Sequence, residues 1–272
     1  MASLLALSRA EADEAKRLWM FSALAHASTL GLATAALFAA GAWTYTLALS
    51  ALVAESIAWY LRHEAAGRHA LAEEGRRRAS LIENLGSDSE SLDSAAITSR
   101  YSKRACARAG AHEDPDYWAA ARSHGPDRLR EALQESAFWS AALFRAAARL
   151  LLKVVIALVI LIGLAVFTLA ALSPGSAAEM SSRVGVIFLT VLITSDALSS
   201  ALAWGAAAST ADRVVGRLSN ADPNSLATMA AIFADYATAT AGCPPIPRRI
   251  YDAKHDQLDK AWRAARRPRA AS

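Results

Sequence analysis

The sequence predicts an all-α integral membrane protein that crosses the bilayer with four helices arranged as two hairpins. Apolar residues make up 54% of its 272 residues and charged residues 20%, whereas soluble domains have about 45–50% and about 25%. The apolar excess is concentrated in two blocks, residues 18–61 and 150–204, which are separated and followed by ordinary charged sequence. This alternation predicts membrane spans joined by soluble parts.

The first apolar block, residues 18–61, is long enough for two spans, because one span needs about 20 apolar residues. Residues 18–40 hold one ionisable side chain, His26, and residues 45–61 hold one charged side chain, Glu55. The intervening Gly-Ala-Trp-Thr supplies a flexible glycine for a tight turn and an aromatic ring suited to the membrane interface. We therefore expect a helical hairpin.

The second apolar block repeats this design. Residues 150–172 carry Lys153 near their start and no other charge, and Ser-Pro-Gly-Ser at 173–176 breaks the run. Residues 184–204 follow, with Asp196 as their only charged side chain. A second hairpin is therefore expected.

Two other interpretations of the first span fit the sequence less well. A secretory signal peptide has a shorter apolar core and a basic flank, whereas acidic and basic residues are mixed before this span. A buried helix pair of a soluble protein would not be expected to recur as a second paired block of this length.

The distribution of Lys and Arg predicts the orientation. These residues gather before the first block, between the blocks and in the tail, whereas the turn at Gly41 carries none and the turn at Pro174 is followed only by Arg183. The positive-inside rule then places both termini and the middle region in the cytoplasm. The expected segments are a cytoplasmic N-terminal segment (1–17), hairpin 1 (18–61), a mostly helical cytoplasmic region (62–149), hairpin 2 (150–208) and a helical cytoplasmic tail (209–272).

The middle region is expected to be helical near both hairpins. Residues 62–85 predict a helix that continues from the second span, followed by a break rich in Ser and Asp at 86–90. A short helix is expected within residues 91–110. From Pro126 an apolar stripe at helical spacing begins, and no breaker occurs before the third span. One continuous helix would pass movement of the cytoplasmic part to the span.

The tail predicts two further helices. Asp222 is expected to cap the first of them, with Pro223 in its first turn. The proline-rich residues 242–247 form an elbow. The last helix is basic and amphipathic, and we expect its Tyr251 and Trp262 side to pack on cytoplasmic helices or on the membrane surface.

Asp196, near the centre of the predicted fourth span, is a candidate functional acid. An unpaired carboxylate there costs about 2.5–3.5 kcal/mol on insertion scales. Asp196 can be interpreted in two ways. It lines or gates a pore, or it is protonated and forms hydrogen bonds where helices pack together. Glu55 is the second candidate, although we favour a side chain that reaches the headgroup zone. For His26 we favour an interfacial histidine over a proton relay. Small polar residues surround the first acid: Thr190, Thr194, Ser195, Ser199 and Ser200.

The sequence lacks P-loop, HExxH, GxSxG and dinucleotide-loop motifs. We therefore predict no enzymatic activity, no cofactor and no metal site. Cys106 and Cys243 form neither a CxxC pair nor a Cys/His cluster, so we expect two inert thiols. Basic runs at residues 76–78 and 263–269 are expected to meet anionic lipid headgroups or to act simply as topology signals, and not to bind nucleic acid.

Four short stretches carry a family resemblance: AEADEAKR at residues 10–17, DYW at 116–118, QESAFWS at 134–140 and PIPRRIY at 245–251. With this layout the chain resembles the SMODS-associating four-transmembrane effectors of bacterial cyclic-oligonucleotide antiphage systems. The likeness covers nearly the whole chain in order and spacing. It implies an effector in the bacterial inner membrane that a cyclic oligonucleotide, made by a partner nucleotidyltransferase, activates to disrupt the membrane.

Two function classes therefore compete. The first is a homo-oligomeric effector that permeabilises the membrane, in which the face around Asp196 lines an aqueous path. The second is a non-conducting membrane scaffold or accessory subunit. A small transporter fits less well, because the sequence shows no inverted repeat with broken half-helices.

Overall fold

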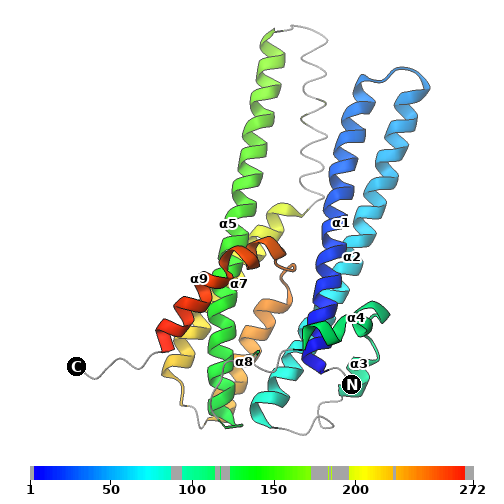
Figure 1. The fold of residues 1–272 in the computed structure, drawn as a ribbon. Coiled ribbons are helices and arrows are strands. Elements are labelled where there is room, and N and C mark those ends of the chain that lie inside the picture. Colours follow the sequence, from blue (N-terminus) through cyan, green and yellow to red (C-terminus); the bar gives the residue numbers. More distant parts are fainter. Residues whose placement is uncertain are drawn as a thin grey trace. The chain divides into compact units, whose positions relative to one another are not determined.

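The computed structural model describes residues 3–86, 94–113, 117, 123–172, 183, 185, 196–222 and 225–266. Within these residues the chain forms eight α-helices and one 3-10 helix and no strand, which confirms the all-α class. In chain order the elements are α1 (Leu4–Phe38), α2 (Ala42–Leu85), α3 (Ser94–Thr98), α4 (Lys103–Arg108), the 3-10 helix η2 (Ala109–His112), α5 (Pro126–Leu172), α7 (Ala197–Asn220), α8 (Leu226–Ala241) and α9 (Arg248–Arg266) (Figure 1).

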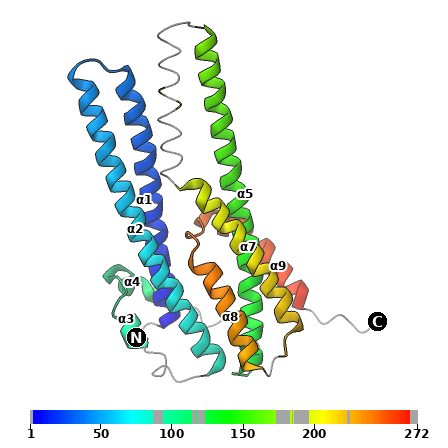
Figure 2. The ribbon, with the colours of Figure 1, turned by 180° about the vertical axis from the view of Figure 1, so that it is seen from behind.

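The predicted turn of hairpin 1 is confirmed. α1 ends at Phe38 and α2 begins at Ala42, and Gly41 between them has a φ of 62°, in the left-handed region that favours glycine. The Thr44 hydroxyl donates a hydrogen bond to the carbonyl of Ala39 at 2.9 Å and closes the turn. Figures 1 and 2 show α1 and α2 side by side below this turn.

The two long helical continuations are also confirmed. α2 extends to Leu85, and α5 runs for 47 residues without interruption. α1 and the segment Pro126–Leu164 of α5 are the two described helices that are long and apolar enough to cross a membrane. Most of the predicted fourth span lies outside the described residues.

The chain divides into two compact units. Unit 1 consists of Met1–Lys16, Ala66–Ala147 and Ala203–Ser272. Unit 2 consists of Arg17–Ala65 and Ala148–Leu202. The boundaries fall inside helices α1, α2, α5 and α7, so each of these helices contributes residues to both units.

The main core of unit 1 lies where α5, α7 and α8 pack together, and both ribbon views show these helices side by side (Figures 1 and 2). Apolar side chains at helical spacing on each helix meet there, and burying one large aliphatic side chain contributes about 1.5–3 kcal/mol. The buried members are Leu133, Ala137, Ala141, Ala211, Val214, Leu218, Met229, Ile232 and Tyr236.

A second cluster in unit 1 joins the start of α1 to the segment of α3 and α4. Leu7, Ile97 and Tyr101 are buried in it, and the Tyr101 hydroxyl lies 2.8 Å from the Ser8 hydroxyl. A Cβ atom added at Gly75 of α2 would lie 1.8 Å from the Tyr101 hydroxyl oxygen. Glycine at this position leaves room for the hydroxyls of Tyr101 and Ser8 against α2.

The start of α8 corrects one prediction. Asp222 does not cap this helix, because α8 begins at Leu226 and its N-cap is Ser225. The Ser225 hydroxyl accepts a hydrogen bond from the Thr228 amide at 3.3 Å, which is the role of an N-cap side chain. The Asp222 carbonyl instead accepts a bond from the Ser225 amide at 3.2 Å and forms a turn. Pro223 lies outside the described residues.

α9 packs its aromatic side against α5. Leu258 and Trp262 are each 7% exposed, and the ring centroids of Phe138 and Trp262 lie 5.5 Å apart. Tyr251 stacks on Trp139 with a centroid distance of 6.2 Å. We expected this side of α9 to pack on other helices or on the membrane surface, and in the structure it packs on helix α5.

Candidate functional site: a polar seam within unit 2

Large apolar side chains lie on the outside of unit 2. Among the described residues, every exposed large apolar side chain except Leu226 and Tyr251 belongs to this unit. Phe167 is 73% exposed and Leu161 is 63% exposed. Soluble monomers rarely expose contiguous apolar surface of this extent.

The interior of unit 2 shows the opposite composition. Its buried residues within the described part are small or polar, with the exception of Val155. They are Ser22, His26, Thr29, Ala36, Ala51, Ala58, Ala65, Val155, Ser200 and Ala201. Small residues and hydroxyls between helices, with large apolar side chains outside, are the arrangement found where the surroundings are hydrocarbon.

His26 and Glu55 pair inside hairpin 1. The Nδ1 atom of His26 lies 3.1 Å from Oε2 of Glu55, and His26 is 5% exposed. One turn away, the Ser22 hydroxyl donates a hydrogen bond to the Ala58 carbonyl at 2.9 Å. Sequence reasoning treated the histidine and the acid separately. The spacing of Ser22, His26 and Thr29 on one face of α1 is the signal that could have identified the α1 side of this contact.

Asp196 lies in a turn directly before α7, with a φ of 50°. The prediction of an unbroken helix over residues 184–204 is therefore wrong at this position. The Asp196 carbonyl accepts hydrogen bonds from the Ser200 amide at 2.8 Å and the Ser199 hydroxyl at 2.9 Å, and the first of these begins the α-helical bonding of α7. Asp is also among the few residues that adopt the left-handed region readily. The neighbours Thr194 and Ser195 lie outside the described residues.

Arg62 of α2 is the charged partner of Asp196. Its Nε atom lies 3.5 Å from Oδ2 of Asp196, and its Nη2 atom donates a hydrogen bond to the Ser200 hydroxyl at 3.2 Å. The Asp196 side chain is 57% exposed. Such a pair contributes about 0–1 kcal/mol in water, and more where water is excluded. Sequence reasoning used Arg62 only as a signal of orientation.

We call these three contacts, His26–Glu55, Ser22–Ala58 and Arg62–Asp196–Ser200, the polar seam. Glu55, Ala58 and Arg62 occupy one face of α2, because residues three and four apart lie above one another on a helix. The seam therefore follows α2 for about 10 Å at 1.5 Å per residue. Arg62 and Asp196 carry opposite charges, whereas the His26–Glu55 contact is an ion pair only if His26 is protonated.

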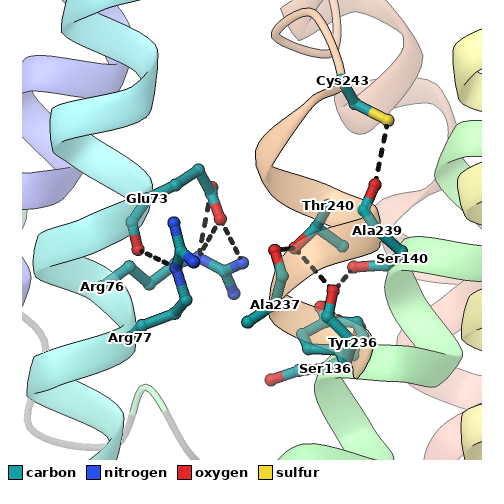
Figure 3. A network of polar contacts seen from close by, with 10 residues as sticks. All are labelled: Glu73, Arg76, Arg77, Ser136, Ser140, Tyr236, Ala237, Ala239, Thr240 and Cys243. Carbon is teal, nitrogen blue, oxygen red and sulfur yellow. Dashed lines mark hydrogen bonds and ion pairs between the residues drawn. The ribbon is translucent and has the colours of Figure 1, made fainter. Parts of the chain in front are cut away.

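Unit 1 contains two further groups of polar contacts, one within α2 and one between α8 and α5 (Figure 3). Arg76 donates a hydrogen bond from Nη2 to Oε2 of Glu73 at 2.6 Å. Burial alone would raise the pKa of Glu73, but the charge and hydrogen bonds of Arg76 outweigh burial and lower it. On the α8 side, the Tyr236 hydroxyl lies 2.8 Å from the Ser140 hydroxyl.

The two cysteines occupy different surroundings. Cys106 is exposed, whereas Cys243 is 5% exposed and its thiol lies 3.5 Å from the Ala239 carbonyl oxygen. Burial, with a smaller effect of the Glu73 charge, raises the pKa of the Cys243 thiol to about 11. This thiol is therefore unreactive while unit 1 is folded.

The acidic stretch before the first span is buried in unit 1. Glu11 is 1% exposed and accepts hydrogen bonds from Arg68 Nη1 at 3.1 Å and from the Ser102 amide and hydroxyl at 3.0 and 2.7 Å. Glu14 is 3% exposed and accepts a hydrogen bond from Arg108 at 3.0 Å. The contacts of these two acids with α2 and α4 could not be predicted from the sequence, because their partners lie 57 to 94 residues away.

No family model, curated protein or solved structure matches the chain.

Proposed function

We propose that this chain is an effector of the bacterial inner membrane that makes the membrane permeable when it is activated. The observation that carries the proposal is the inverted composition of unit 2, whose large apolar side chains face outward and whose interior is small and polar. That distribution suits a unit surrounded by lipid that can open an inner polar surface.

Four spans in two hairpins, with both termini and residues 62–149 in the cytoplasm, form the proposed topology. The length and composition of α1 and α5 support two of the spans. The apolar exposed residues of α2, such as Leu49 and Leu52, support a third. The concentration of Lys and Arg outside the apolar blocks supports the orientation.

The polar seam is the proposed gate. In the closed state Arg62 pairs with Asp196 and His26 lies against Glu55, and water has no continuous path. Opening separates Arg62 from Asp196, and several copies of the chain together line the path with the freed groups. Unpaired charges are costly in hydrocarbon, so the open seam must face water or protein.

Activation by a nucleotide second messenger from a partner nucleotidyltransferase is part of the proposal, and it rests on the family resemblance alone. Unit 1 is the proposed receiver, because α1, α2, α5 and α7 each run from unit 1 into unit 2. Movement in unit 1 can therefore reach the seam through continuous helices. The proposed activity involves no catalysis and no cofactor.

Entry of a membrane-impermeant dye tests the proposal. Bacterial cells would express the chain with and without the nucleotidyltransferase encoded beside it, and membrane levels of the chain would be measured in parallel. We expect dye entry and growth arrest only when both proteins and the inducing signal are present. Intact cells at normal membrane levels, or the absence of a neighbouring nucleotidyltransferase gene, would favour the non-conducting scaffold.

A further inference from the structure

A groove opens on the surface of unit 1 between α7 and α8, which Figure 2 shows side by side. Its volume is about 530 Å³, and small-molecule sites have volumes of about 300–1,000 Å³. One face of each helix lines the groove, with Arg213, Gly216, Arg217 and Asn220 on α7 and Thr228 and Ile232 on α8. The groove is therefore large enough to hold a small molecule.

The floor of the groove is apolar and its rim is polar. Ile232 is 1% exposed and belongs to the main core of unit 1. Asn220 and Thr228 are exposed at the rim. The Asn220 side-chain amide donates a hydrogen bond to the Gly216 carbonyl at 3.2 Å, which leaves its second N–H for a ligand. An apolar surface with a few placed polar groups is the usual composition of a ligand site.

The α7 side of the groove carries positive charge. Arg213 and Arg217 lie one helical turn apart, so both guanidinium groups can reach a single group bound between them. Arg213 donates a hydrogen bond to the Thr210 hydroxyl at 2.8 Å and has no carboxylate partner in the described part of the chain. Arg217 forms an ion pair with Asp235 of α8. Two arginines and one aspartate leave one positive charge in excess. The planar donor fork of arginine matches the oxygen atoms of a phosphate group.

Gly216 keeps the space between the two arginines open. A Cβ atom added at this position would meet no atom within 4 Å. No close approach of another element therefore requires glycine here, although glycine weakens a helix relative to alanine. Its effect on the groove is to leave room for a bound group beside both guanidinium groups.

We propose that the groove between α7 and α8 binds a small molecule by its phosphate group, which Arg213 and Arg217 hold above the apolar floor. A soluble phosphorylated compound and the headgroup of an anionic lipid both offer this chemistry. A role of the groove in receiving a nucleotide signal rests on the proposed function. The binding itself is a property of unit 1 and does not require membrane activity.

Equilibrium dialysis of radiolabelled adenosine monophosphate against the full-length chain in detergent tests the site. We expect saturable binding that pyrophosphate displaces and adenosine, which has no phosphate, does not. R213Q and R217Q should each bind about tenfold more weakly, because each loses a charge-assisted hydrogen bond. The matched control is R263Q, which removes an arginine of α9 that also pairs with a carboxylate, that of Asp259. R263Q should bind like the parent chain.

A second pair of variants tests the space in the groove without removing a charge. G216L places a side chain between the two arginines and should also bind about tenfold more weakly, because the ligand is excluded. G67L places the same side chain at a glycine of α2 in unit 1 that likewise has open space around it, and it should bind like the parent chain. Thermal unfolding of each variant in the same detergent shows that it is folded.

Competition separates the two sources of the phosphate group. If dihexanoyl phosphatidylglycerol displaces adenosine monophosphate at a lower concentration than pyrophosphate does, the ligand is a lipid headgroup, and the reverse order assigns a soluble ligand. The proposal would be overturned if neither adenosine monophosphate nor pyrophosphate binds saturably, or if R263Q and G67L lose as much binding as the groove variants. Dye entry into cells is measured separately, so failure of this site and failure of the proposed function are distinguishable.

Discussion

At the scale of single residues, Asp196 combines a charge with an unusual backbone conformation. Its carboxylate faces Arg62 at 3.5 Å, and its φ of 50° is one that Asn and Gly also tolerate. D196N and D196G therefore remove the charge without forcing the backbone out of its conformation. Leu would change both properties and is less informative.

We expect D196N and D196G to admit dye in cells that lack the activating partner, because Arg62 then loses its carboxylate and the seam is held less tightly. Asp212, which pairs with Arg145 in unit 1, supplies the matched control D212N. Dye entry and membrane level would be measured for each variant. If both Asp196 variants show the same dye entry and membrane level as the parent chain, this acid serves only in packing.

Gly75 provides a second test at this scale, on stability. In G75A the new Cβ would lie 1.8 Å from the Tyr101 hydroxyl oxygen and 2.3 Å from that of Ser8. We expect a loss of about 1–3 kcal/mol in the free energy of unfolding of unit 1. Y101F in the G75A background removes the nearest atom and should restore part of the loss. Thermal unfolding in detergent measures the loss of stability in G75A and its partial recovery in the double variant.

Gly67, on the same helix, is the control for helix propensity. A Cβ at this position meets no atom within 4 Å, so G67A should stabilise the helix by about 0.5–1 kcal/mol. Equal effects of G67A and G75A would contradict the close approach of α2 and Tyr101.

At the scale of elements, α9 is bound to α5 through a few aromatic contacts. Trp262 is 7% exposed whereas Tyr251 is 43% exposed. A buried Trp-to-Ala change costs about 3–5 kcal/mol, so W262A should release α9 from α5 and let the helix unfold, which makes its basic residues cleavable by trypsin. Y251A should have a smaller effect. Equal cleavage rates for W262A and the parent chain would contradict the packing of α9 on α5.

Deletion of residues 248–272 extends this test to function. It retains Pro244, whose carbonyl accepts the bond from Trp204, so the elbow and α7 keep their contact. We expect normal membrane insertion and weaker dye entry, because α5 loses the packing of α9 on its unit 1 segment. Full dye entry in cells that express this shortened chain would show that α9 does not contribute to activity.

At the scale of the whole molecule, the proposed topology makes a prediction that is independent of activity. Reporter fusions after Gly86 and after Ser272 should both report a cytoplasmic location, because Lys and Arg flank the apolar blocks on that side. A fusion in the turn at Gly41 should report the opposite side. A periplasmic signal from either of the first two fusions would overturn the four-span arrangement.

The sequence by itself determined the helices, the turn of hairpin 1 and the continuous α2 and α5, because apolar periodicity, length and glycine act locally along the chain. Local reasoning failed at residues 222–226, where Asp222 and Ser225 are both good caps, and at Asp196, where a polar turn interrupts an apolar run. Both acids proposed as site residues were visible in the sequence, because charges in apolar blocks stand out.

Only the tertiary structure decided which polar and charged side chains lie next to one another. Arg62 reaches Ser200 across 138 residues, Ser102 reaches Glu11 across 91, and His26 reaches Glu55 across 29. Pairs so distant in sequence depend on how helices pack, and packing is set by the shapes of many side chains at once. Composition alone therefore predicted a charged residue in an apolar block, and the fold decided that it would be paired.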